Sequence, residues 1–314
     1  MASKALQARP RVSISQISTF TASFADDVEA YRAAGLDGIG IWEQKLGEGP
    51  DDDALLRLER SGLDRASAVP AVPSILPLPL LGGPEDPRER IDAILASLHR
   101  LAPFRPSGIV CLTGTGAGRD PDAARGIVVQ GLREIAAEAA SLDLRIALEP
   151  YQRDSGEEWT IVSTVPEALE LIRDAGDLPA LALQFDIWHL WNTETLFDDI
   201  TEHVARFAGV HVSDMRLPTR GFADRAAPGN GVAGVPRILA ALAEAGFDGL
   251  YDVEIFSDDG TLGASYEDSL WRLDPGDAAR LLRDAFLACW QARESALPPS
   301  PSSDRELRRL TMKE

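Results

Sequence analysis

The stretch "ALQFDIWHLWN" (residues 182–192) combines two kinds of sequence that are rarely adjacent. Its first half is apolar and alternating, as expected for the end of a buried strand. Asp186 and His189 then follow three residues apart, next to Trp188 and Trp191. This pattern predicts either a functional site at the carboxyl end of a strand, or an aspartate that caps the next helix beside a stacked histidine.

Similar apolar runs recur along the chain and alternate with amphipathic segments. The predicted strands lie at 11–16, 38–43, 66–72, 108–113, 145–150, 181–186, 209–214 and 250–256. The clearest helical periodicity lies at 87–103, 122–143, 234–247 and 274–295. Eight strands separated by helices predict an α/β fold, a single (β/α)₈ TIM barrel. An open doubly wound sheet is less consistent, because no glycine-rich dinucleotide turn follows the first strand.

No linker or change of composition divides most of the chain. We therefore expect one barrel domain over residues 1–296. The remaining segment, "LPPSPSSDRELRRLTMKE" (297–314), is rich in Pro and Ser and then charged. It is expected to be a polar tail that is either disordered or reaches a neighbouring subunit.

The composition excludes several classes of protein. A net charge of −19 over 314 residues argues against nucleic-acid binding, which draws on a basic surface. No apolar run is long enough to cross a membrane, and the first residues lack the apolar segment of a signal peptide. The only two cysteines, Cys111 and Cys289, form no metal or disulfide pattern. We therefore expect a cytoplasmic protein with no membrane partner.

Four potential metal ligands lie at or near the ends of four consecutive predicted strands. They are Glu149, Asp186, His211 and Glu254. In a barrel these strand ends meet at one mouth, so the four side chains should surround one point. Each alone could be a solvent-facing acid or a core histidine, but burying them together is costly unless a cation neutralises them. Three carboxylates and an imidazole favour Mn²⁺ or Mg²⁺, with Zn²⁺ or Co²⁺ as alternatives.

The order Glu, Asp-x-x-His, His-x-x-Asp, Glu resembles the sugar isomerase/epimerase superfamily, and so does the loop "DRAAPGNG" (224–231). These xylose isomerase-like TIM barrels include ketose 3-epimerases, inosose isomerases and inosose dehydratases. The resemblance covers nearly the whole chain. It implies that a metal is held by Glu149, Asp186, His211 and Glu254. It also implies that His189 and Arg225 contact the substrate.

The expected reaction is proton removal next to the carbonyl of a keto-sugar or polyol ketone, with a cation stabilising the enediolate. Glu149 and Glu254 would be catalytic acid and base on opposite faces of the substrate. Returning the proton to the same carbon inverts it, and returning it to the neighbouring carbon isomerises the sugar. His189 would hold substrate oxygens or shuttle a proton, and Arg225 would pair with developing charge. Trp188 is expected to bind the sugar ring, although ordinary barrel packing explains it equally well.

A lyase or dehydratase shares the first half of this mechanism, because the same enediolate can expel a leaving group. Inosose dehydratases follow that route, and so do catalytic subunits of 3-keto-C-glycoside deglycosidases, which would imply a small partner subunit. The abasic-site endonuclease relatives are disfavoured by the charge and by a total of four histidines. We expect a homo-oligomer that binds a small carbohydrate substrate.

Overall fold

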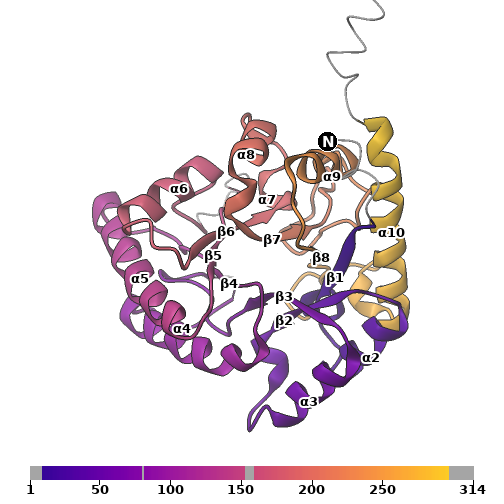
Figure 1. The fold of residues 1–314 in the computed structure, drawn as a ribbon, viewed down its shortest axis with the longest axis horizontal. Helices are drawn as coiled ribbons and strands as arrows, with labels where there is room; N and C mark the ends of the chain where they lie inside the picture. The colour runs from indigo at the N-terminus through magenta and orange to yellow at the C-terminus, as the bar shows by residue number, and fades with distance from the viewer. Residues whose placement is uncertain (1–8, 80, 153–158, 297–314) are drawn as a thin grey trace, which may run out of the picture.

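The computed structural model describes residues 9–79, 81–152 and 159–296, which form a closed barrel of eight parallel strands surrounded by helices (Figure 1). Consecutive strands pair with one another, and the first pairs with the last, with Val12 beside Tyr251. The strands are β1 Arg11–Ser15, β2 Gly38–Trp42, β3 Asp64–Val69, β4 Gly108–Cys111, β5 Ile146–Leu148, β6 Leu181–Asp186, β7 Phe207–Val212 and β8 Leu250–Val253. The predicted TIM barrel and all eight predicted strands are confirmed, with ends that differ by a few residues.

Helices cover the outside of the barrel (Figure 1). They are α2 Phe24–Ala33, α3 Asp52–Ser61, α4 Pro87–Leu101, α5 Pro121–Ser141, α6 Val165–Asp174, α7 Ile187–Leu190, α8 Leu196–His203, α9 Val235–Ala245 and α10 Pro275–Ala296. The short 3₁₀ helices are η1 Gln16–Thr19, η2 Glu43–Leu46, η3 Ala102–Phe104, η4 Val204–Arg206 and η5 Leu270–Arg272. The four predicted helices correspond to α4, α5, α9 and α10.

The local sequence explains where several helices begin. The side chains of Asp86, Asp120 and Thr164 each accept a hydrogen bond from a backbone N–H in the first turn of α4, α5 and α6. A proline lies in the first turn of each of these helices, where its missing N–H costs nothing. These caps fix the point at which the chain leaves the mouth of the barrel and turns back along its outside.

Alternation along β8 divides its side chains between the helices and the inside of the barrel. Tyr251 faces outward, with its ring 5.6 Å from Phe286 and 5.4 Å from Trp290 of α10. Asp252 faces inward and is 1% exposed. Gly40 on β2 makes room for it, because a Cβ at position 40 would lie 2.1 Å from its Oδ2. The interior of the barrel therefore contains a carboxylate in addition to its apolar side chains.

The loops after β3 and β4 are joined at the mouth of the barrel. The Leu76 N–H donates to Thr113 O at 2.8 Å, and the Thr115 N–H donates to Pro77 O at 2.9 Å. Gly114 lies between these two bonds with a φ of 74°. A Cβ there would lie 2.1 Å from Leu76 O. Only glycine therefore allows the two loops to approach this closely.

Within the described ranges, no helix has both the length and the apolar character needed to cross a membrane. The predicted polar tail, residues 297–314, lies outside the described residues, and the division into domain and tail stays a prediction.

We expect Gly114→Ala to lower the free energy of unfolding by about 2–4 kcal/mol, because the new Cβ would meet a carbonyl oxygen at a positive φ. The matched control is Gly126→Ala in α5, where no heavy atom lies within 4 Å of the added Cβ. That change should raise the free energy of unfolding by up to about 1 kcal/mol. Chemical denaturation measures both, and equal effects would contradict the account of the loop.

Candidate metal centre

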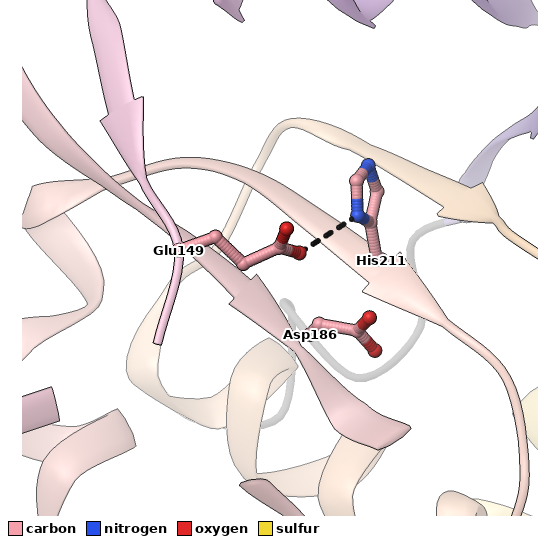
Figure 2. A group of neighbouring side chains, drawn as sticks. All are labelled: Glu149, Asp186 and His211. Carbon is pink, nitrogen blue, oxygen red and sulfur yellow. Dashed lines mark hydrogen bonds and ion pairs between the residues drawn. The ribbon is translucent and has the colours of Figure 1, made fainter. Parts of the chain in front are cut away.

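Three ionisable side chains converge at the carboxyl ends of neighbouring strands. Glu149 follows β5 directly, Asp186 is the last residue of β6, and His211 lies near the end of β7. All three are at most 4% exposed. Each offers a ligand atom that lies within 4.8 Å of those of the other two. Figure 2 shows their side chains directed into the same space.

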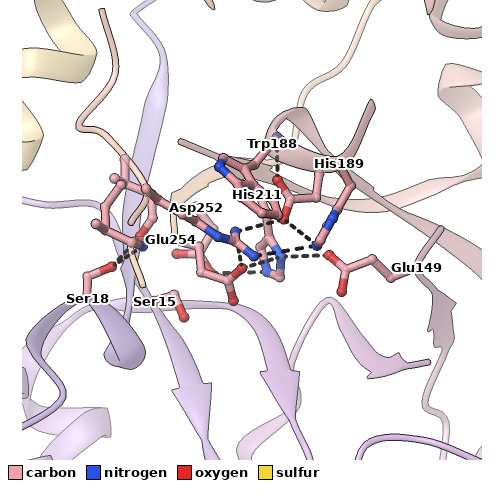
Figure 3. A network of polar contacts seen from close by, with 12 residues as sticks. Ser15, Ser18, Glu149, Trp188, His189, His211, Asp252 and Glu254 are labelled. Atoms are coloured by element: carbon pink, nitrogen blue, oxygen red, sulfur yellow. Dashed lines mark hydrogen bonds and ion pairs between the residues drawn. The ribbon is translucent and has the colours of Figure 1, made fainter. Parts of the chain in front are cut away.

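Glu254, the fourth predicted ligand, approaches the same histidine from the other side. The sequence placed Glu254 within a strand at 250–256, but β8 ends at Val253, so Glu254 is the first residue after it. Its Oε2 lies 3.4 Å from Nδ1 of His211, and Oε1 of Glu149 lies 3.1 Å from that nitrogen. Figure 3 shows the two glutamates on opposite sides of the imidazole. Glu254 is therefore a neighbour of His211, although the group whose ligand atoms all lie within 4.8 Å of one another consists of Glu149, Asp186 and His211.

The two ring nitrogens of His211 face different surroundings. Nδ1 faces the glutamates, whereas Nε2 lies 2.9 Å from Oγ of Ser67 on β3. Burial opposes a charged ring, but the negative charges of Glu254 and Glu149 outweigh it and raise the pKa of His211 to about 10. Without a cation the ring is therefore protonated on both nitrogens, and Nδ1–H donates to Glu149.

Arg225, predicted as a substrate contact, lies within this cluster. Its Nη1 donates to Asp186 Oδ2 at 2.9 Å and to Glu254 Oε2 at 3.0 Å. The residue is 1% exposed. Burial would raise the pKa of Asp186, but the charge of Arg225 outweighs it and keeps that pKa below its ordinary value. Arg225 thus joins two of the predicted ligands.

Aromatic rings enclose the Arg225 guanidinium. Its central carbon lies 4.7 Å from the ring of Trp188, 4.7 Å from that of Phe256 and 5.4 Å from that of Phe222. The faces of aromatic rings attract a cation, so these contacts stabilise the charge in a site with little water. Trp188, which was predicted to bind substrate, is 2% exposed and packs on the arginine.

His189 is a neutral side chain whose ring stacks on Tyr151, with 3.7 Å between centroids. Its Nδ1 accepts the N–H of Gln152 at 3.3 Å, and Arg225 Nη2 lies 3.5 Å from Nε2. The shorter contact favours the tautomer in which Nε2 carries the ring proton. Burial lowers the pKa of His189 to about 3, against the opposing charge of Asp186. Nε2 lies 3.6 Å from Asp186 Oδ2. His189 can therefore donate its N–H to an oxygen in this cluster at neutral pH.

Asp186 combines the two roles that the sequence left as alternatives. Its Oδ1 accepts the Trp188 N–H at 2.8 Å and caps α7. Its Oδ2 faces Arg225 and the ring of His189. Because the short helix starts on the strand-end aspartate, the histidine three residues later returns to the same point.

The loop after β7 is held in a fixed shape around Arg225. The buried carboxylate of Asp214 accepts N–H groups of Met215, Gly229 and Ala233 at 2.9, 3.0 and 2.9 Å. These bonds join the two ends of the loop, so the arginine is carried by an ordered segment.

The donor set fits a divalent cation. Glu149, Asp186 and Glu254 carry three negative charges when ionised, and Arg225 supplies one positive charge. A divalent cation would supply the other two, so the charges of these four side chains would balance with His211 neutral. Burial raises the pKa of Glu149 to about 7, with His211 opposing the rise.

Four other side chains at this cluster were not predicted as site residues: Ser67, Tyr151, Phe222 and Asp252. The position of Asp252 could have been inferred from the sequence, because residues two apart along an extended chain point the same way and Asp252 precedes Glu254 by two residues. Ser67 reaches His211 from across the barrel, and the other two come from loops. No spacing in the sequence indicates those contacts.

A family model described as the xylose isomerase-like TIM barrel matches residues 28–283. The chain belongs to that family. The match includes all four predicted ligands, and it confirms the resemblance found in the sequence. No curated protein sequence matches the chain significantly.

Solved structures share this xylose isomerase-like fold over nearly their whole length. Protein SMc04130 from Sinorhizobium meliloti has a TM-score of 0.76 and 22% identity, over 89% of this chain and 98% of that one. The IolI protein, solved with a zinc atom, has a TM-score of 0.70 and 17% identity, over 90% and 99%. D-Psicose 3-epimerase, solved in the presence of D-fructose, has a TM-score of 0.70 and 18% identity, over 90% and 99%. At these identities the similarity establishes the fold alone.

We expect this xylose isomerase-like barrel to bind about one divalent cation per chain and to release protons as it does so. The cation must displace the Nδ1 proton of His211 and, in acid, also the proton of Glu149. Both groups hold protons more tightly than usual, so lower pH should weaken cation binding. Calorimetry in buffers of different ionisation enthalpy should find about one proton released near pH 8 and a number approaching two near pH 6. An affinity independent of pH would contradict the ligand set.

Proposed function

We propose that the protein is a divalent-cation-dependent isomerase or epimerase that removes a proton next to the carbonyl of a keto-sugar or polyol ketone. The observation that carries this proposal is the pair of glutamates, Glu149 and Glu254, on opposite sides of His211 Nδ1. A substrate held between them would present one face to each carboxylate. D-Psicose 3-epimerase, which shares the fold, supports the choice of a ketose-like substrate.

The two carboxylates would divide the proton transfers between them. One glutamate takes the proton from the carbon beside the carbonyl, and the other returns a proton on the far face, which inverts that carbon. Return to the adjacent carbon moves the carbonyl and isomerises the sugar. Burial raises the pKa of Glu149 to about 7 without a cation, and a bound cation would lower it and leave the carboxylate free to accept a proton.

Arg225 and His189 would orient the substrate and stabilise charge on its oxygens. The guanidinium is fixed by its bonds to Asp186 and Glu254, so it needs little rearrangement as negative charge develops. His189 is neutral and would donate Nε2–H to a substrate oxygen, which favours holding an oxygen over shuttling a proton. Trp188 would support the arginine from one side.

A divalent cation held by Glu149, Asp186, His211 and Glu254 would polarise the carbonyl and its neighbouring hydroxyl. Mn²⁺ or Mg²⁺ suits a set of three carboxylates and one imidazole. Zn²⁺ or Co²⁺ is the alternative, and the zinc atom in IolI supports testing it.

Elimination by the same enediolate is the second candidate, and the aromatic side chains near the cluster favour it. Phe222 packs edge to face on Trp159 and on Phe256, each at 4.9 Å, and on Trp188 at 5.6 Å. Such a wall suits a substrate with a planar or apolar leaving group. In that case the enzyme would be a lyase or dehydratase, and a small partner subunit would suit a deglycosidase.

Incubation with ketoses, inososes and 3-keto-glycosides in D₂O distinguishes these reactions by mass spectrometry. For isomerisation or epimerisation we expect a product that has gained deuterium but otherwise has the formula of the substrate. Loss of water or of an aglycone would instead identify elimination. No exchange and no product from any compound, with the cation bound, would contradict proton abstraction.

We expect Glu254→Gln to lower kcat by about 10²–10⁴-fold or more, because the enzyme loses one of its two proposed acid–base groups. Glu244→Gln makes the same change on the exposed side of α9 and should leave kcat unchanged. Steady-state turnover of the active compound measures both. Near-normal turnover by Glu254→Gln would remove that residue from the mechanism.

A further inference from the structure

Two buried polar side chains inside the barrel have no part in the mechanism above. Ser67 on β3 is 2% exposed, and Asp252 on β8 is 1% exposed. Both approach Nε2 of His211, the nitrogen directed away from the glutamates. The Ser67 Oγ lies 2.9 Å from it, and the Asp252 Oδ2 lies 3.9 Å from it. Burial destabilises the Asp252 carboxylate, whereas the charge of His211 and the hydroxyl of Ser13 stabilise it.

The serine hydroxyl determines which edge of the imidazole faces the carboxylates. In the observed orientation Nε2–H donates to Ser67, while Nδ1 faces Glu149 and Glu254. Turning the ring over would replace Nε2–H with a carbon at the serine and leave that buried bond unmade. A lost hydrogen bond between buried groups is costly, so Ser67 selects one ring orientation.

Asp252 lies at the same edge of the ring, with its Oδ2 3.9 Å from Nε2. Burying a carboxylate costs free energy, and position 40 carries no side chain, which leaves room for the one at position 252. Its nearest opposite charge is the N–H edge of His211. A carboxylate behind a histidine favours the proton on the near nitrogen and makes the far nitrogen a better electron donor. An apolar side chain at position 252 could not do this.

We propose that Ser67 and Asp252 are positioning residues that hold the Nε2 edge of His211 and so direct the Nδ1 lone pair to the divalent cation. This inference rests on the cation of the proposed function, but it does not depend on which substrate is used or on which reaction follows. It assigns a role to a serine and an aspartate that do not touch the cation or the substrate.

Calorimetric titration with Mn²⁺ and Co²⁺ tests the proposal without any substrate. We expect Ser67→Ala and Asp252→Asn each to weaken cation affinity by about 10–100-fold, with a changed absorption spectrum of the Co²⁺-loaded protein. Ser97→Ala removes the same atom from the buried face of α4 and should leave affinity and spectrum unchanged. Wild-type affinity and spectrum in both barrel variants would overturn the proposal.

A measurement on the unaltered protein covers the case in which a variant does not fold. Long-range ¹H–¹⁵N spectra of the Zn²⁺-loaded wild type should show His211 protonated at Nε2 and bound through Nδ1. Binding through Nε2, or a proton at Nδ1, would overturn the proposal. If affinity falls in the variants but no keto-sugar exchanges deuterium, the positioning role stands and the proposed function fails. If the wild type binds no divalent cation, both fail.

Discussion

Three carboxylates buried at one point form the constraint on which the rest of the site depends. Their mutual repulsion and loss of hydration would destabilise the fold unless positive charge is supplied close by. Within the chain, Arg225 supplies one positive charge by bonding Asp186 and Glu254, and the protonated ring of His211 supplies a second. Burial raises the pKa of Glu149 to about 7, so a proton on that carboxyl group neutralises the third negative charge below this pH. A divalent cation would replace these two protons and preserve the same charge balance.

The barrel meets this constraint by joining rigid strands to loops with internal hydrogen bonds. The strands fix the positions of the four predicted ligands, and the loop after β7 brings Arg225 to them from a separate part of the chain. Asp214 keeps that loop in shape by binding three of its N–H groups, and the aromatic rings of Trp188, Phe222 and Phe256 surround the guanidinium. The arginine and the two histidines are thus held with little freedom to rearrange, as electrostatic catalysis would require.

Much of the fold and part of the site could be predicted from local patterns. Strand and helix periodicity identified the barrel, because each period reports which face is buried. The proximity of Glu149, Asp186 and His211 could be predicted because all three lie at or near the ends of apolar strands. The family resemblance indicated Arg225, whose loop has no periodicity of its own. The contact of Ser67 with His211 and the stacking of Tyr151 on His189 depend on the closure of the barrel and on loop geometry. Nothing in the spacing of those residues indicates either contact.

The close approach of Gly40 and Asp252 links two positions more than two hundred residues apart. A carboxylate at 252 requires that position 40 carry no side chain, and a side chain at 40 requires a smaller residue at 252. A side chain at position 40 can therefore be accepted only together with a smaller residue at position 252, whereas glycine at 40 is compatible with the acid. An alignment of relatives would display this as covariation across the barrel. It would also distinguish relatives that have a carboxylate next to the residue at position 211 from those that do not.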